Sequence, residues 1–194
     1  MTDTLRKTMI PFVVGANHRS SGLSFRDRLF VEDVMVPGFL QKLSAQGVSE
    51  ALVLSTCDRV EVQGVHEEPE SITPVIREAF AHHAEMESTD FGEQLYSLFD
   101  EEALRHIMRV ASSLDSQVIG EPQVLGQVKA AHRIARDAGA VGGALEAILQ
   151  GAYNTAKQIM TDTAIGERPV SIAAGAVQLA RDVQGDLGKC RAVL

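Results

Sequence analysis

The sequence lacks any long apolar run and contains only two cysteines. No stretch approaches the ~20 apolar residues that a membrane span needs. The apolar run at residues 9–16 is short, and no clean small-x-small cleavage site follows it, so a secretory signal is not predicted either. Cys57 and Cys190 lie far apart and form no disulfide framework and no metal-ligand spacing. These features favour a protein of the reducing cytoplasm.

An excess of basic charge is also missing. The net charge of −8 argues against general nucleic-acid affinity, so a nucleic-acid partner would have to contact local basic patches. Internal repeats and low-complexity stretches are absent from the sequence. The 194 residues, 45% of them hydrophobic and 23% charged, suit a globular protein of one large domain or one domain plus a fragment.

The hydrophobic pattern of the first hundred residues predicts alternating strands and helices. Strands are expected at residues 10–16, 51–55, 60–65 and 94–99, and helices at 25–30, 32–46 and 72–86. Pro37 should kink the second helix, and Pro74 should lie in the first turn of the third. Residues 60–65 alternate apolar and polar, which is typical of a half-buried strand. This order predicts an α+β fold, the ferredoxin-like split βαβ class, with helices on one face of an antiparallel sheet.

After residue 100 the pattern is almost purely helical, with helices expected at residues 101–112, 123–138, 145–163 and 170–183. The last residues resemble the opening of a strand. We therefore predict one unit at 1–165 (α+β over 1–100, helical over 101–165), followed by a helical segment at 166–186. Residues 187–194 would begin the first strand of a domain that has been cut off.

Cys57 lies in the polar turn "STCDR" between two predicted strands. A nearby cation such as Arg59 favours the thiolate that a nucleophile needs. The alternative is an inert, buried cysteine, and the spacing alone leaves the two interpretations open. Cys190 lies in the predicted C-terminal strand and is interpreted as structural.

His106 lies on a predicted helix whose apolar stripe runs through residues 104, 107, 108 and 111. At 100° per residue it points away from that stripe, so it is not expected in the core. It is either an ordinary surface histidine or part of the wall of a cleft.

Gln123 and Gln127 share one face of the helix that begins after Pro122. Glutamine offers both a donor and an acceptor, and a helix N-terminus offers free N–H groups, which together suit recognition of an amino acid. Two ordinary surface glutamines on a capped helix are the alternative.

Four stretches together resemble one family, glutamyl-tRNA reductase. They are "STCDRVE", "SSLDSQVIGEPQVLGQVKAA", "GANHRS" and "AKQIMTDTAIGERPVSIAAGAVQLA". The resemblance covers most of the chain and weakens at about residues 66–95. It implies the first step of the five-carbon route to tetrapyrroles (porphyrin biosynthesis). A cysteine thiolate takes the glutamyl group from glutamyl-tRNA as a thioester, which NADPH reduces to glutamate-1-semialdehyde.

The resemblance implies that residues 1–165 are the catalytic glutamyl-tRNA-binding domain, 166–186 the connecting helix and 187–194 the first strand of an NADPH-binding domain. It also implies roles for individual residues. Cys57 would be the nucleophile, and His106 would orient the substrate or assist proton transfer. The implied substrate-binding residues are Thr56, Asp58, Arg59, Ser116, Glu121, Pro122, Gln123 and Gln127. Arg59 is suited to hold a carboxylate by a bidentate pair. The implied partners are glutamyl-tRNA, glutamate-1-semialdehyde aminomutase and, for the full-length protein, a second copy in a homodimer.

Two departures from the family pattern matter. Asp58 stands where the family usually has Asn, and a carboxylate there could disfavour the thiolate or repel the substrate, unless it points away. The segment "HRSSGLSFRDRL" lacks the common T-A-P.

No G-x-G-x-x-G turn occurs in the sequence, so the NADPH site is expected outside this chain, which would then only acylate and deacylate. Two rival hypotheses are a non-catalytic homologue that binds tRNA or a protein partner, and a simple thiol esterase.

Overall fold

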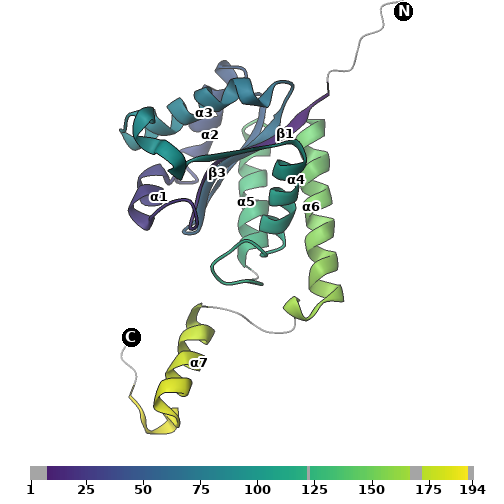
Figure 1. Cartoon of the computed structure of the whole chain (residues 1–194). Coiled ribbons are helices and arrows are strands. Elements are labelled where there is room, and N and C mark those ends of the chain that lie inside the picture. The colour runs from purple at the N-terminus through teal and green to yellow at the C-terminus, as the bar shows by residue number, and fades with distance from the viewer. Residues whose placement is uncertain (1–7, 122, 167–171, 192–194) are drawn as a thin grey trace, which may run out of the picture.

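The computed structural model describes residues 8–121, 123–166 and 172–191 (Figure 1). The strands are β1 (Ile10–Asn17), β2 (Glu50–Ser55), β3 (Arg59–His66) and β4 (Tyr96–Phe99). The α-helices are α1 (Leu23–Leu29), α2 (Val36–Ala45), α3 (Pro69–Ala84), α4 (Asp100–Ala111), α5 (Gln123–Asp137), α6 (Gly143–Asp162) and α7 (Ile172–Gln184). Short 3-10 turns lie at Ser88–Gln94, Ala164–Gly166 and Leu187–Lys189. Within these ranges, no helix combines the length and the apolar character that crossing a membrane would require.

The four strands form one sheet in the order β2-β3-β1-β4, and all neighbouring strands are antiparallel. β1 and β2 therefore run in the same direction with β3 between them, which is the split βαβ arrangement. The predicted α+β fold is confirmed. The register of β1 against β3 places Asn17 opposite Arg59 and Gly15 opposite Glu61.

Helices cover both faces of the sheet: those of the first hundred residues lie on one face, as predicted, and the later helices cover the other. α1, α2 and α3 lie on one side, and α4, α5 and α6 lie on the other (Figure 1). The side chains of β1 alternate accordingly. Phe12 belongs to the core that includes Phe80 of α3, whereas Val13 packs with Ala103 and Ile107 of α4. The helical part that follows β4 folds back over the face that the split βαβ unit leaves open.

β3 corrects one prediction, because it is buried from Arg59 to Val65 rather than half-buried. The alternation of polar and apolar residues is real. However, its polar members Arg59, Glu61 and Gln63 face the α4 side of the sheet and are each at most 1% exposed. Buried polar groups must find partners inside the protein, and these three do so in the network described below.

Two helices begin at different positions from those predicted. α2 begins at Val36, so Pro37 lies in its first turn and does not kink a longer helix. α3 begins at Pro69, so that proline takes the first-turn position and Pro74 lies inside the helix. A proline in the first turn is well tolerated because its missing N–H has no intrahelical partner there in any case.

The C-terminal segment contains α7, which lies within the range predicted for the connecting helix. In Figure 1 this helix lies apart from the body of the protein. The strand predicted at 187–194 is not formed up to residue 191: Leu187–Lys189 is a 3-10 turn, and Cys190 after it is exposed. A strand needs a neighbouring strand to satisfy its backbone, and none pairs here in the described residues. Residues 192–194 and the start of the predicted helix at 170 lie outside the described ranges. The division into domains stays a prediction.

Candidate active site around Cys57

Cys57 is exposed at the tip of the turn that joins β2 to β3. The buried Thr56 shapes this turn, because its hydroxyl accepts the N–H groups of Asp58 and Arg59, each at 3.2 Å. The N–H of Thr56 donates to the carbonyl of Arg59 at 2.8 Å. Threonine is suited to such local bonds with its own turn. The exposure of Cys57 excludes the interpretation of a buried, inert cysteine.

A pocket of about 370 Å³ opens beside Cys57. Most of the predicted substrate-binding residues line it together with the cysteine, although they come from three separate segments. The lining includes Thr56, Cys57, Asp58, Arg59, Ser116, Glu121, Gln123 and Gln127. Pro122, the remaining predicted residue, lies outside the described ranges. A pocket of this volume suits a small molecule or the end of a larger one.

Ser116 gives the pocket an unused polar group. The residue is only 4% exposed, and its hydroxyl has no hydrogen-bond partner in the described part of the chain. Buried hydroxyls are normally hydrogen-bonded, so a free one in the lining of a pocket is suited to a ligand. On the same lining, Gln123 and Gln127 project from the first turns of α5. The pocket can therefore present several donors and acceptors to one polar molecule.

Asp58 ties the cysteine turn to the loop that carries Ser116. Its carboxylate accepts the backbone N–H of Gln117 at 2.9 Å and the side-chain amide of Gln117 at 2.6 Å. The sequence left open whether the Asp58 carboxylate faces the substrate or points away, and in the structure both of its oxygens are bonded to Gln117. Its charge nevertheless stays next to Cys57.

We expect Asp58→Asn to preserve this connection and to increase the reactivity of Cys57. An asparagine oxygen can still accept the N–H of Gln117, while the negative charge disappears. Two unit charges about 4 Å apart in water interact by about 1 kcal/mol, which corresponds to roughly a fivefold change in the rate at which the thiolate reacts. The measurement is the rate of alkylation of Cys57 by iodoacetamide, with Cys190 of the same chain as internal reference. A rate at Cys57 that is unchanged or lower would show that the Asp58 charge does not restrain the thiol.

Arg59 anchors a buried polar network behind the pocket. Its guanidinium lies 2.7 Å from Glu61 and also donates to the backbone carbonyl of Asp115. Glu61 in turn accepts the amide of Gln63 at 2.7 Å and the hydroxyl of Tyr96. Arg59 is therefore held in place before any ligand arrives.

Charge and hydrogen bonding keep Glu61 ionised inside the protein. Burial alone would raise the pKa of its carboxyl, but the charge of Arg59, followed by the charge and hydrogen bond of His106 and the hydroxyl of Tyr96, holds that pKa well below its usual range. Burial and then the Glu61 charge raise the pKa of Tyr96 far above its usual range, so this phenol stays a donor. Gly15 allows β1 to lie close to β3 at this point, since a Cβ there would clash with the carbonyl oxygen of Val60 and lie 2.6 Å from Cα of Glu61.

His106 is buried, which corrects the expectation that it would avoid the core. It is 8% exposed, and the buried face of α4 is centred on Ala103, Ile107 and Val110 rather than on the stripe predicted from the sequence. Nε2 of His106 lies 2.9 Å from Glu61, and Nδ1 lies 3.4 Å from the carboxylate of Asp115. The face carries a polar residue because the strand beneath it is polar.

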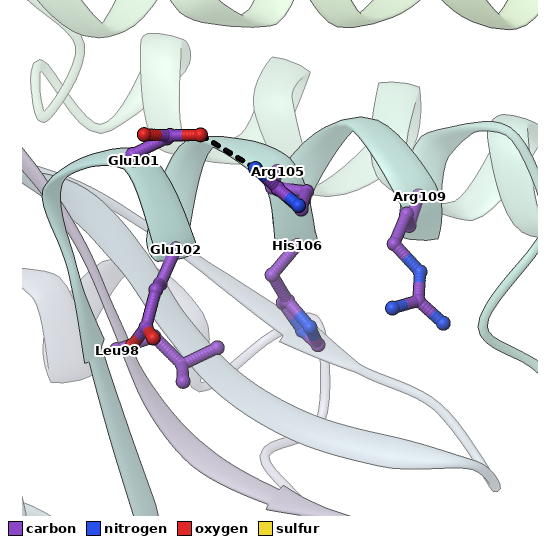
Figure 2. Close-up of a pocket in the computed structure, with 6 residues that line it drawn as sticks. All are labelled: Leu98, Glu101, Glu102, Arg105, His106 and Arg109. Carbon is purple, nitrogen blue, oxygen red and sulfur yellow. Dashed lines mark hydrogen bonds and ion pairs between the residues drawn. The ribbon is translucent and has the colours of Figure 1, made fainter.

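The structure does not place His106 among the residues that line the Cys57 pocket. It lines a separate hollow with Leu98, Glu101, Glu102, Arg105 and Arg109. Figure 2 shows His106 pointing from α4 toward the sheet, with Glu101 and Arg105 paired on the outer side of the helix. The two sites connect through the network, since Arg59 lines the first and His106 the second.

Sequence reasoning missed the network residues Glu61, Tyr96 and Asp115. A signal was present, because Glu61 is a charged residue on the polar side of a strand that alternates polar and apolar residues. That signal becomes informative only when the face of the strand is known to be buried. In the described ranges, no group of three or more His, Cys, Asp or Glu residues could hold a metal ion.

Comparison with known proteins agrees with this geometry. A family model described as "Glutamyl-tRNAGlu reductase, N-terminal domain" matches residues 14–163. Glutamyl-tRNA reductase of Rhodospirillum rubrum is 46% identical over 177 residues, which are 91% of this chain and 41% of the relative. The enzyme of Pseudomonas fluorescens is 43% identical over 183 residues, 93% of this chain and 42% of the relative.

A solved structure, glutamyl-tRNA reductase from Methanopyrus kandleri, superposes with a TM-score of 0.67 at 28% identity and covers 89% of this chain and 39% of its own. The chain spans about two fifths of the length of these relatives. The match extends over the cysteine turn, the sheet that carries it and the helices that close the pocket. The chain therefore belongs to the glutamyl-tRNA reductase family and corresponds to its N-terminal domain.

Proposed function

We propose that Cys57 accepts the glutamyl group of glutamyl-tRNA as a thioester. The thiol loses its proton, the sulfur attacks the ester carbonyl, and a new C–S bond forms as the C–O bond to the terminal ribose breaks. The ribose oxygen takes up a proton and the tRNA leaves. The observation that carries this proposal is an exposed cysteine that lines a pocket of about 370 Å³ together with several polar side chains.

The lining of the pocket supports a division of roles. Thr56 shapes the cysteine turn, and Ser116 offers its free hydroxyl. Gln123 and Gln127 offer amides, and Glu121 a carboxylate suited to an ammonium group. We assign Arg59 to a substrate carboxylate, since the residue lines the pocket and Glu61 anchors its guanidinium. We infer that His106 acts through Glu61 and Arg59, as a positioning residue rather than by direct contact with the reacting atoms.

The reduction step implied by the family requires hydride from NADPH. The 194-residue sequence contains no G-x-G-x-x-G turn, so its residues do not fit a dinucleotide, and no step at them is assigned to the cofactor. We propose that this chain alone transfers the glutamyl group to Cys57 and then loses it to water. Glutamate-1-semialdehyde aminomutase and a second copy of the protein remain predicted partners, and the cytoplasm remains the predicted location.

The experiment is a single turnover with glutamyl-tRNA and NADPH, quenched rapidly and analysed by mass spectrometry. We expect a glutamyl adduct on Cys57, followed by free glutamate and deacylated tRNA, with no semialdehyde and no NADPH oxidation. The reason is that the thioester meets only water once the tRNA has left. An adduct that never forms would contradict acyl transfer. NADPH oxidation at the rate of deacylation would contradict the limited activity and reveal a cofactor site in this chain.

A further inference from the structure

Arg26 is a buried cation that contacts the backbone of the candidate nucleophile. It lies on α1 and is 5% exposed. Its Nε donates to the carbonyl of Cys57 at 3.3 Å, and its terminal NH1 donates to the carbonyls of Ser21 at 2.6 Å and Asn17 at 3.5 Å. No carboxylate pairs with it among the described residues. All three acceptors are backbone groups.

These contacts join three separate parts of the chain. Asn17 ends β1, Ser21 precedes α1, and Cys57 lies on the turn between β2 and β3. A second bond in the same place runs from the N–H of His18 to the carbonyl of Asp58 at 2.9 Å. Fixing the carbonyl of Cys57 restricts the rotation of the peptide plane that follows its Cα, and thereby the direction in which Cβ and the sulfur point.

We propose that Arg26 is the positioning residue of the nucleophile: it holds the Cys57 turn so that the sulfur faces the pocket. The inference deepens the proposed function, and rests on it, because it concerns the same thiol. Arg26 acts on Cys57 through the backbone, and it lies outside the residues that line the pocket.

Arg26 also leaves a positive charge beside the turn. Arg59 is paired with Glu61, whereas Asp58 is hydrogen-bonded only by the neutral Gln117 and keeps its negative charge beside the same turn. Burial lowers the pKa of His18, with the charge of Arg19 adding to this and Asp58 opposing it, so His18 is neutral near pH 7. Removal of the Arg26 charge should therefore make the potential at Cys57 more negative and disfavour an anionic reagent relative to a neutral one.

The main test compares Arg26→Gln, Arg26→Lys and the control Arg28→Gln in single-turnover acyl transfer. Arg28 lies on the same helix and also donates to two backbone carbonyls, those of Ala84 and Glu85, but it does not contact the Cys57 turn. We expect Arg26→Gln to slow transfer at saturating glutamyl-tRNA by about 10- to 100-fold, the range that a misplaced reacting group produces, with half-saturation unchanged. Arg26→Lys should recover part of the rate, and Arg28→Gln should match the original protein.

A second test does not depend on the proposed function. Iodoacetate is an anion and iodoacetamide is neutral. The rate of alkylation by iodoacetate divided by the rate by iodoacetamide therefore reports the electrostatic potential at one thiol. This ratio should fall a few-fold at Cys57 in Arg26→Gln, stay near the original value in Arg26→Lys, and not change at Cys190 in any variant. The thermal unfolding of each variant is recorded to show that it is folded under the assay conditions.

The two sets of results separate the hypotheses. If Cys57 is never acylated by glutamyl-tRNA but its alkylation ratio still depends on Arg26, the proposed function is overturned and the placement of Arg26 beside the Cys57 turn is kept. A folded Arg26→Gln variant with the original transfer rate would overturn the role of Arg26 and keep the proposed function. If Arg26→Gln does not fold, Arg26→Lys decides the question, since a full transfer rate in that variant shows that the three-carbonyl contact is dispensable.

Discussion

Cys57→Ser is expected to abolish acyl transfer from glutamyl-tRNA, because the hydroxyl that replaces the thiol is a far weaker nucleophile at neutral pH. Loss of the nucleophile in a well-studied hydrolase lowers the rate by a factor on the order of 10⁶, so no transfer should be detectable. The measurement is deacylation of labelled glutamyl-tRNA under single-turnover conditions. Unfolding by heat should be unchanged, because Cys57 is exposed.

Cys190→Ser is the matched control. Both cysteines are exposed, so the pair separates a specific site from general thiol chemistry. Cys190 lies after the turn at Leu187–Lys189 and is not part of the pocket lined by Cys57. The control should transfer the glutamyl group at the original rate. Equal loss in both variants, or loss in neither, would contradict the assignment of Cys57.

Glu61→Gln is expected to lower the free energy of unfolding by about 3–5 kcal/mol, the usual effect of removing one partner of a buried ion pair. The variant leaves the charge of Arg59 buried without its carboxylate, and a single neutral amide oxygen must then serve Arg59, Tyr96 and His106. The measurement is urea denaturation at pH 7. The matched control is Glu101→Gln, which breaks an exposed pair with Arg105 and should change stability by less than about 0.5 kcal/mol.

The same carboxylate should leave a signature in the pH dependence of stability. The folded-state pKa of Glu61 lies below the unfolded value, which is about 4.3 for a free glutamate. Its contribution is therefore complete above that pH and is lost as the pH falls toward the folded pKa. Between about pH 5 and pH 3 the original protein should lose stability more steeply than Glu61→Gln. The role given to Glu61 would be refuted if stability fell with pH in parallel for the original protein and Glu61→Gln. It would also be refuted if Glu101→Gln lost as much stability as Glu61→Gln.

Much of the local structure follows from short-range pattern. The strands around Cys57 were predictable from alternation and β-branched residues, and α5 from the helical spacing that brings Gln123 and Gln127 to one face. Local chemistry also predicted the tight polar turn, which Thr56 and Asp58 favour, but it left open whether Cys57 is exposed. Where prolines allowed two helix starts, as at Pro37 and Pro69, the pattern alone did not choose between them.

The sequence by itself determined the strand order along the chain, the cysteine turn and the polar residues that line the pocket. Only the tertiary structure decided that Arg59, Glu61 and His106 are buried together, that Gln117 engages Asp58, and that Arg26 contacts the carbonyl of Cys57. The physical reason is distance along the chain. Alternation shows that a strand has a polar face, but the helix that packs over that face decides whether it meets water or a buried partner. That helix, α4, begins more than thirty residues after β3 ends.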